Sequence, residues 1–167
     1  CFSEYSTMKN KQWNREGAWQ KIIDYLIELG YDCVSVSAEN SNLKNIIKHD
    51  GQSVEDILAD IRGAEFYVGL NHGPSWIAYS LGIPVIMLTG VSEPWNDFPT
   101  PYRISVDVCK PCFNDPDLPI NRGWEWCGRN RDYACTKEIT EEMVIEQINR
   151  IVYKESSVFQ QKQQKEG

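Results

Sequence analysis

The chain has 167 residues, with 17 Lys or Arg against 24 Asp or Glu, so its formal net charge at pH 7 is −7. This length predicts one domain or one half of a two-domain protein, and 41% apolar residues argue against general disorder. The acidic balance excludes a general nucleic-acid binder, and no apolar run approaches the ~20 residues of a membrane span. There is no signal peptide, and the start at Cys1 without a Met predicts a piece of a longer protein.

The N-terminal third predicts two helices and a strand. Residues 3–14 are polar without a period and predict a loop. Asn14 then caps a helix that ends at Gly30, because apolar residues follow at the i, i+3, i+4, i+7 spacing of one helix face. Residues 33–37 alternate like a strand, and residues 43–48 predict a short helix.

A second clear helix, after the short one at residues 43–48, is predicted from Ser53 to Gly63. Ser53 and Asp56 form a variant of the capping box at its start, and Gly63 ends it. Its apolar spacing predicts one buried stripe made of Val54, Ile57, Leu58 and Ile61.

Strands at residues 66–70 and 84–88 enclose a turn at residues 71–74 and a helix at residues 75–81. The resulting alternation of helix and strand predicts an α/β fold, a Rossmann-like open parallel sheet with helices on both faces.

The chain changes in texture after Gly90. Prolines and tryptophans are frequent and little periodicity remains. Residues 104–108 predict a last strand. Thr140 is expected to cap a closing helix, and the tail at residues 160–167 is expected to be disordered.

The turn at residues 71–74 has the chemistry of an anion site. A helix that starts directly after a parallel strand offers unpaired N–H groups and the positive end of its dipole. Gly73 lets an anion approach the backbone, Pro74 suits the first helical turn, and His72 and Ser75 add an imidazole and a hydroxyl. These residues predict a pyrophosphate site; a tight turn without a ligand is an equally weighted alternative.

Two other polar segments allow a functional and a plain interpretation. Residues 3–13 carry hydroxyl groups and the ammonium groups of Lys9 and Lys11, which suit a phosphate clamp, although this segment alone favours a solvated linker. Glu39 follows a predicted strand, where an acidic residue can accept hydrogen bonds from ribose hydroxyls; a surface glutamate is the alternative.

Four cysteines have the spacing C-x2-C-x14-C-x7-C: Cys109, Cys112, Cys127 and Cys135. Two residues between the first pair allow both sulfur atoms to reach one tetrahedral metal. Four thiolates bind iron or zinc and leave no position for substrate, so the metal is predicted to be structural. Two disulfides are the alternative, which the α/β pattern and the missing signal peptide disfavour. Cys33, inside a predicted strand, is expected to be a buried apolar residue.

No catalytic set emerges from the sequence. A Ser-His-Asp order and a Walker motif are both absent. Asp97 and Asp115 are candidate bases without a distinguishing context, and His49 is expected to be exposed.

The stretch from Gln52 to Pro94 resembles the C-terminal domain of the heptosyltransferases of lipopolysaccharide synthesis, which is the nucleotide-sugar half of a GT-B fold. The residues that carry the resemblance are Val54 to Leu58, Ala64 to Gly69, His72 to Ser75 and Ala78 to Val85. Together with Thr89 to Trp95 and the four cysteines, this stretch is similar to the autotransporter heptosyltransferases. These are bacterial protein O-glycosyltransferases with an iron-binding cysteine finger. The segment from Ser6 to Trp13 looks like the family's segment that leads into the C-terminal domain.

The resemblance, which covers about residues 3–153, implies a cytoplasmic bacterial enzyme. Its donor would be ADP-heptose, and its acceptors would be serine hydroxyls of an autotransporter adhesin. Thr7 and Lys11 would contact phosphates, and Glu39 would bind the ribose. The pyrophosphate would lie on Gly73, Pro74 and Ser75, with His72 beside them, and the four cysteines would hold iron, with zinc as the alternative.

The resemblance also implies a division of the protein. Residues 1–153 would form the donor-binding domain, with the metal finger at 105–137 inserted before the C-terminal helix, and 154–167 would be a polar tail. The family's N-terminal domain, with the acceptor groove and the catalytic base, is not among these residues. The chain is therefore expected to bind donor without transferring sugar alone, and its catalytic residues stay unknown. Assembly into a homo-oligomer is left open.

Two other functions remain open. One is a metal-stabilised interaction module, in which the finger and Trp95, Trp124 and Trp126 dock a protein partner without nucleotide. The other is a nucleotide-sugar epimerase with a similar half, which is not expected to carry the cysteine finger.

Overall fold

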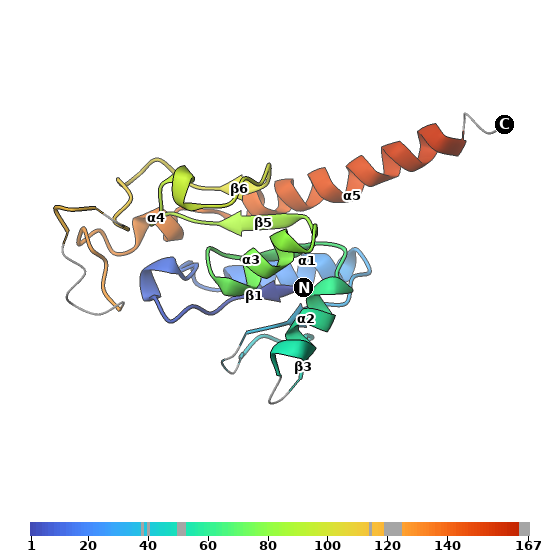
Figure 1. Ribbon diagram of the computed structural model, residues 1–167, viewed down its shortest axis with the longest axis horizontal. Coiled ribbons are helices and arrows are strands. Elements are labelled where there is room, and N and C mark those ends of the chain that lie inside the picture. The colour runs from blue at the N-terminus through green and yellow to red at the C-terminus, as the bar shows by residue number, and fades with distance from the viewer. Residues whose placement is uncertain (38, 40, 50–52, 114, 119–124, 164–167) are drawn as a thin grey trace.

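The computed structural model describes residues 1–37, 39, 41–49, 53–113, 115–118 and 125–163, with backbone alone for 154–163. The described strands form one parallel sheet in the order β3-β2-β1-β4-β5-β6 (Figure 1). Their bounds are β1 Phe2–Ser3, β2 Val34–Ser35, β3 Ile47–Lys48, β4 Tyr67–Leu70, β5 Val85–Leu88 and β6 Arg103–Ile104. The predicted α/β class with an open parallel sheet is confirmed.

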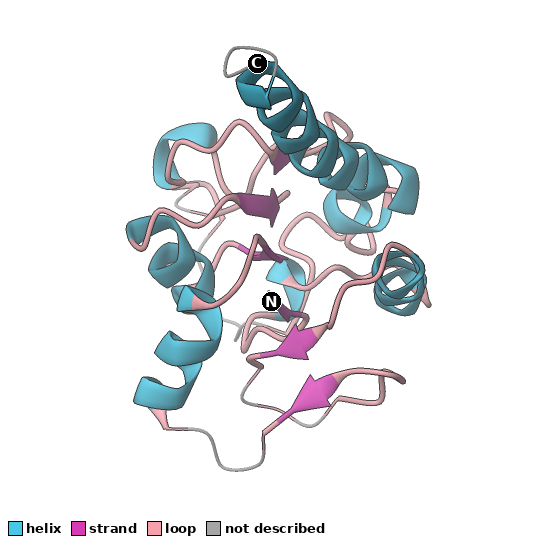
Figure 2. Ribbon diagram, turned by 90° about the vertical axis from the view of Figure 1, so that its right-hand side faces the viewer, coloured by secondary structure: helices cyan, strands magenta, loops and turns pink. Residues whose placement is uncertain are grey.

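Helices cover both faces of this sheet (Figure 2). The α-helices are α1 Ala18–Glu28, α2 Val54–Arg62, α3 Gly73–Ser80, α4 Ala134–Lys137 and α5 Glu141–Gln163. In the described part of the chain, the 3-10 helices η1 Lys9–Lys11 and η2 Pro94–Asn96 lie in connecting loops. Helices α1 and α5 contact each other, as do α2 and α3, and the two pairs lie on opposite faces.

The two central strands divide their side chains between two cores, because successive residues of a strand point to opposite faces. Val68 and Leu70 of β4 belong to the core beneath α1 and α5, as do Ile86 and Leu88 of β5. Tyr67 of β4 faces the smaller core beneath α2 and α3. Both strands are buried throughout, as expected for parallel strands covered on two faces.

The first predicted loop and the first helix start were partly wrong. Phe2 and Ser3 form β1, a strand at the centre of the sheet, which is too short to show a period of its own. Asn14 does not cap α1, because its side-chain amide donates to the carbonyl oxygens of Lys9 and Gln12 at 2.9 and 2.8 Å. The helix begins at Ala18, and its preceding residue makes no side-chain cap.

The predictions for residues 43–63 had mixed outcomes. Residues 47–48 are strand β3 at the sheet edge and not part of a short helix, because they pair with β2. The capping box of Ser53 and Asp56 at the start of α2 is confirmed. Its buried stripe is narrower than predicted: among the four residues only Ile61 is buried, and Val54 is 63% exposed.

The last strand and helix lie close to their predicted places. Strand β6 is Arg103–Ile104, and the Thr140 hydroxyl accepts a hydrogen bond from the Met143 amide at 3.4 Å at the start of α5. Helix α5 continues to Gln163, into the segment for which a polar tail is predicted, and extends away from the body of the protein (Figure 1). Residues 164–167 lie outside the described residues. Within the described part, no helix has the length and apolar character that crossing a membrane requires.

Candidate functional site

Strands β1 and β4 form the switch point of the sheet. From β1 the sheet continues to β2 and β3 on one side and to β4, β5 and β6 on the other. Ser3 pairs with Gly69, so the loops that leave these two strands start side by side. Ligands of open α/β sheets bind beyond the carboxyl ends of the strands at such a point. Figure 1 shows the loop after β1 and the segment before α4 on the side toward which β5 points.

The ammonium group of Lys11 lies half-buried in the loop after β1. Its Nζ atom is 5.1 Å from the centroid of the Phe113 ring. Burial lowers the pKa of Lys11, and the nearby Asp97 carboxylate partly opposes this effect. Among the described residues no oxygen accepts a hydrogen bond from this ammonium group and no carboxylate forms an ion pair with it. Lys11 therefore has free donors for an anion.

His72 faces the same region from the loop after β4. Burial, followed by the positive charge of Lys11, lowers the pKa of His72 to about 4, so the imidazole is neutral at pH 7. Its Nε2 atom is buried and has no hydrogen-bond partner among the described residues. Asn10 Oδ1 after β1 and Asn96 Nδ2 after β5 are in the same condition. An unpaired buried polar atom costs about 1–3 kcal/mol, so three of them in neighbouring loops indicate a ligand site.

The start of α3 is open to solvent. A Cβ atom at Gly73 would meet no atom within 4 Å, and Pro74 lies in the first turn as predicted. The Ser75 side chain, by contrast, is fully buried, and its hydroxyl donates to the Leu70 carbonyl oxygen. The Ser75 amide bonds to the His72 carbonyl oxygen at 3.1 Å. The backbone at Gly73 is thus the accessible part of this turn, and Ser75 shapes it from below.

Asp97 connects the loops of this edge, a role that the sequence did not reveal. Its carboxylate is fully buried and accepts hydrogen bonds from Asn71 Nδ2, from Ser92 Oγ at 2.8 Å and from Arg103 Nε at 2.9 Å. Asn71 in turn accepts from Trp76 Nε1 at 3.1 Å. The only sequence signal was a set of polar residues after a buried strand.

The other predicted donor contacts lie in exposed loops. Thr7 is exposed in the loop after β1, and Glu39 is exposed after β2, where its carbonyl oxygen accepts from Lys48 Nζ. Because β1 and β2 are neighbouring parallel strands, both residues belong to the same edge as Lys11.

The four cysteines of the predicted finger carry free thiols and influence one another. Burial raises the pKa of Cys112, and the charges of Cys127 and Cys109 raise it further. Burial and the other three thiols raise the pKa of Cys135 to about 12. In the described residues no group of three or more His, Cys, Asp or Glu side chains has the geometry of a metal site. Four cysteine sulfur atoms are ligands that iron and zinc accept once they are deprotonated, so the chemistry of the donors, and not their arrangement here, suits such a metal.

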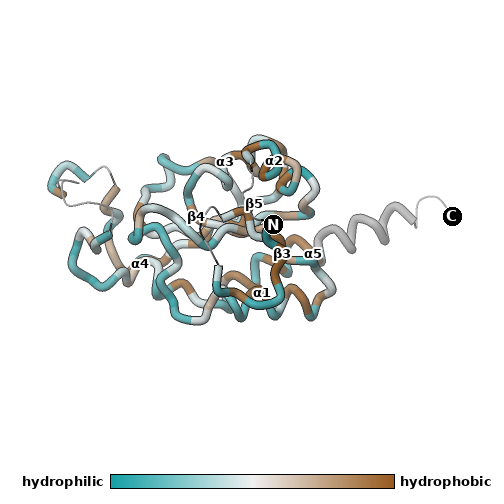
Figure 3. The backbone as a smooth tube through the Cα atoms, turned by 90° about the horizontal axis from the view of Figure 1, so that it is seen from below, coloured by the Kyte–Doolittle hydropathy of each residue, from teal (hydrophilic) through white to brown (hydrophobic). Residues whose placement is uncertain are grey.

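The cysteine segment is fastened to the loop after β5. The amides of Cys112 and Phe113 both donate to the Val91 carbonyl oxygen, at 3.1 and 2.9 Å. A Cβ atom at Gly90 would overlap the carbonyl group of Cys135. Away from these contacts the segment projects from the sheet, and hydrophilic colours predominate on it in Figure 3.

The predicted aromatic docking surface is only partly described. Trp95 is 73% exposed, Trp126 is half-buried and Trp124 lies outside the described residues. Asp115, named as a candidate base, instead forms ion pairs with Arg129 and with Lys110, the latter at 3.0 Å. His49 is exposed as expected.

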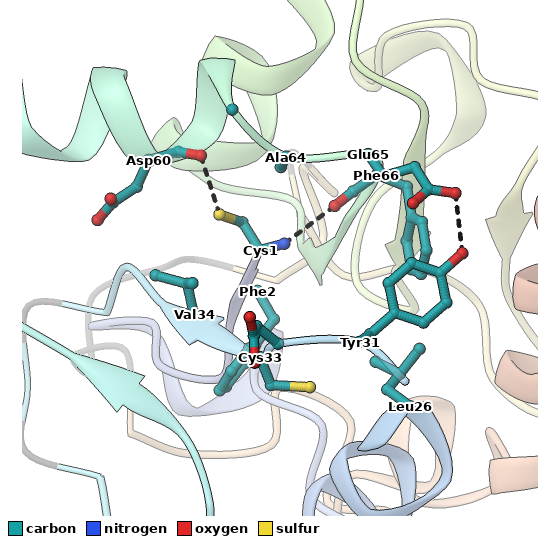
Figure 4. Close-up of a pocket in the computed structure, with 12 residues that line it drawn as sticks. Cys1, Phe2, Leu26, Tyr31, Cys33, Val34, Asp60, Ala64, Glu65 and Phe66 are labelled. Carbon is teal, nitrogen blue, oxygen red and sulfur yellow. Dashed lines mark hydrogen bonds between the residues drawn. The ribbon is translucent and has the colours of Figure 1, made fainter. Parts of the chain in front are cut away.

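A cavity of about 260 Å³ lies at the other end of the strands, where β1, β2 and β4 begin (Figure 4). The Cys1 thiol donates to the Asp60 carbonyl oxygen at 3.2 Å, and the Tyr31 hydroxyl donates to Glu65 at 2.8 Å. Cys33 is buried there with a free thiol, as predicted from its strand. This cavity lies away from the carboxyl ends of the strands and is not the candidate site.

Known proteins are similar to this chain in sequence and in fold. No family model matches the chain. The autotransporter heptosyltransferase BAHTCr of Citrobacter rodentium is 30% identical over 90% of this chain and 41% of its own length. The inactive autotransporter heptosyltransferase BimC of Burkholderia thailandensis is 25% identical over 91% of this chain and 38% of its own. The chain thus spans about two fifths of the length of these relatives.

Solved structures agree with these relatives. The iron-containing dodecameric glycosyltransferase TibC of enterotoxigenic Escherichia coli matches with a TM-score of 0.85 and 28% identity, over 92% of this chain and 45% of TibC. TibC has also been solved in complex with ADP-D-beta-D-heptose. The ADP-heptose lipopolysaccharide heptosyltransferase II of E. coli shares the fold, with a TM-score of 0.65 and 19% identity over 93% of this chain and 46% of that one. In sequence and in fold, this chain is thus similar to the autotransporter heptosyltransferases over about nine tenths of its own length.

Proposed function

We propose that this chain is the donor-binding part of a heptosyltransferase. It binds ADP-heptose, from which the heptose is transferred to serine hydroxyls of an autotransporter adhesin. The observation that carries the proposal is the group of unpaired polar atoms at the switch point. Among the described residues, the Lys11 ammonium has no acceptor and the buried Nε2 atom of His72 has no partner. Lys11 acts on His72 by its charge, and His72 directly precedes the open helix start at Gly73. The complex of TibC with ADP-heptose supports the choice of ligand.

The arrangement suits departure of a diphosphate. In the transfer, the bond between the heptose anomeric carbon and the diphosphate oxygen breaks, and a bond to the acceptor oxygen forms. The acceptor's proton passes to a base that we place in the part of the protein beyond this chain. Negative charge grows on the departing ADP, where Lys11 and the Gly73 amide at the start of α3 stabilise it. The Thr7 hydroxyl donates a further hydrogen bond to the phosphates, and the Glu39 carboxylate accepts hydrogen bonds from the ribose hydroxyls.

Calorimetric titration of the full chain with ADP tests the proposal. Lys11→Ala is expected to weaken ADP binding by about 10- to 100-fold, because a hydrogen bond to a charged group contributes about 1.5–3 kcal/mol. Lys9→Ala is the matched control, because Lys9 lies in the same 3-10 helix but is exposed. Its affinity should equal that of the wild type. An absence of ADP binding to the folded chain would refute the proposal and favour the interaction module instead.

We further propose that Cys109, Cys112, Cys127 and Cys135 hold one structural metal, iron as named for TibC or zinc. Such a metal would fix the segment that the sheet does not hold. Elemental analysis of protein purified without chelator should give about one metal per chain, and Cys127→Ser should abolish it. Cys33→Ala is the control, because Cys33 is buried elsewhere. Mass spectrometry that finds two disulfides among the four cysteines would contradict this proposal.

The cellular setting follows from the same chemistry. Free thiols persist in a reducing compartment, so we place the protein in the bacterial cytoplasm. TibC is dodecameric, and we propose that the whole protein also forms a homo-oligomer. Sedimentation of the full-length protein measures its oligomeric state.

A further inference from the structure

We propose that Phe113, in the cysteine segment, is a positioning residue that holds Lys11 for the donor phosphates. This inference rests on the proposed function. Phe113 is 102 positions away from Lys11 in the chain, yet its ring centroid is 5.1 Å from the Lys11 Nζ atom. That distance lies within the ~6 Å over which the face of an aromatic ring attracts a cation.

Phe113 is itself firmly placed. Its amide and that of Cys112 share one acceptor, the carbonyl oxygen of Val91, at 2.9 and 3.1 Å. Val91 is buried and is the third residue after the end of β5. The backbone that carries the ring is therefore held to the loop after β5 by two hydrogen bonds, although the segment around it has little regular structure.

An aromatic ring suits this task better than a carboxylate would. A lysine side chain loses up to about 2 kcal/mol of conformational entropy when it is fixed, so holding it in advance favours binding. A carboxylate in contact with Lys11 would compete with phosphate for the same N–H donors. The ring attracts the charge through its face and leaves those donors free.

The other groups near Lys11 agree with this division of roles. The charge of Asp97 acts on Lys11 through space, while its carboxylate accepts hydrogen bonds from Asn71, Ser92 and Arg103. His72 faces Lys11 as a neutral imidazole. Among the described residues, Phe113 thus provides the aromatic ring that faces the ammonium group. Through Phe113, the cysteine segment would thereby form part of the donor site.

A double-mutant cycle tests the inference by titration with ADP and with adenosine. Phe113→Leu should weaken ADP binding by about 3- to 30-fold, the range expected for a cation–π contact, and leave adenosine binding unchanged. Phe113→Trp, which keeps an aromatic face, should retain the affinity for ADP. In the Lys11→Ala background, Phe113→Leu should cause no further loss, because its effect passes through Lys11.

Replacing Phe113 with progressively fluorinated phenylalanines keeps the shape of the ring while reducing the charge on its face. ADP affinity should fall stepwise with fluorination at an unchanged melting temperature. The inference would be overturned if Phe113→Leu still weakened ADP binding in the Lys11→Ala background, or if ADP affinity did not change with fluorination. If the wild-type protein binds ADP, either of these results refutes only the role of Phe113 and leaves the proposed function unaffected. If the wild-type protein does not bind ADP, the proposed function itself is refuted.

Discussion

Replacement of Glu141 by Gln should measurably destabilise the fold. Glu141 starts α5, and its side chain is 4% exposed. Its carboxylate accepts from Arg15 Nε at 2.5 Å and from Lys21 Nζ at 2.6 Å, so it joins α5 to α1 and the loop before it. Burial, the largest single effect, raises the pKa of Glu141. The hydrogen bonds from Lys21, the backbone and Arg15 together outweigh it and lower the pKa to about 2.

The pKa gives the magnitude and the pH range of the effect. A decrease from 4.5 to about 2 corresponds to at most about 3 kcal/mol of free energy of unfolding. The Arg15 and Lys21 side chains are 36% and 65% exposed, so solvent screening reduces our expectation to about 1–2 kcal/mol. Because the pKa is lowered on folding, this stability is present above pH 4.5 and is lost as the pH falls toward 2.

Thermal unfolding followed by circular dichroism measures the loss. Glu141→Gln should lower the melting temperature by about 3–6 °C at pH 7, and the difference from wild type should shrink between pH 4.5 and 2. Glu142→Gln is the matched control, since Glu142 is exposed on the same helical turn and forms no ion pair with a described residue of α1. A Glu141→Gln protein as stable as the control, or a difference independent of pH, would refute this reasoning.

Two further substitutions test the packing. Gly90→Ala should destabilise the protein by about 2–3 kcal/mol in urea unfolding, because its Cβ atom would overlap the Cys135 carbonyl group. Gly63→Ala, which meets only ordinary contacts, should stay close to wild type, and equal stability of the two variants would show that the cysteine segment does not pack here. Ser53→Ala removes the capping box of α2 and should cost about 1 kcal/mol, whereas Ser53→Asp should keep most of it. Hydrogen exchange of the α2 amides measures this effect, and unchanged exchange in Ser53→Ala would contradict it.

The sequence determined the fold class and the chemistry that the site can offer. Regular alternation of helix and strand signals, with continuous apolar runs at 66–70 and 84–88, specified a parallel sheet covered on both faces, because only buried strands are apolar throughout. The turn at Gly73 and the spacing of the four cysteines were visible because they are local. The strand Phe2–Ser3 and the edge strand Ile47–Lys48 were missed because two residues carry no period, and their neighbours in the sheet define them.

Only the tertiary structure decided which of these groups meet and which are free. It buried the Ser75 hydroxyl beneath the turn and left the Lys11 ammonium without an acceptor among the described residues. It also brought three hydrogen-bond donors to Asp97, from Asn71, Ser92 and Arg103. It brought Phe113 to Lys11 across 102 positions of the chain, a contact that depends on two backbone hydrogen bonds to Val91. A contact of this kind arises from the packing of distant segments, and no local pattern in the sequence records it.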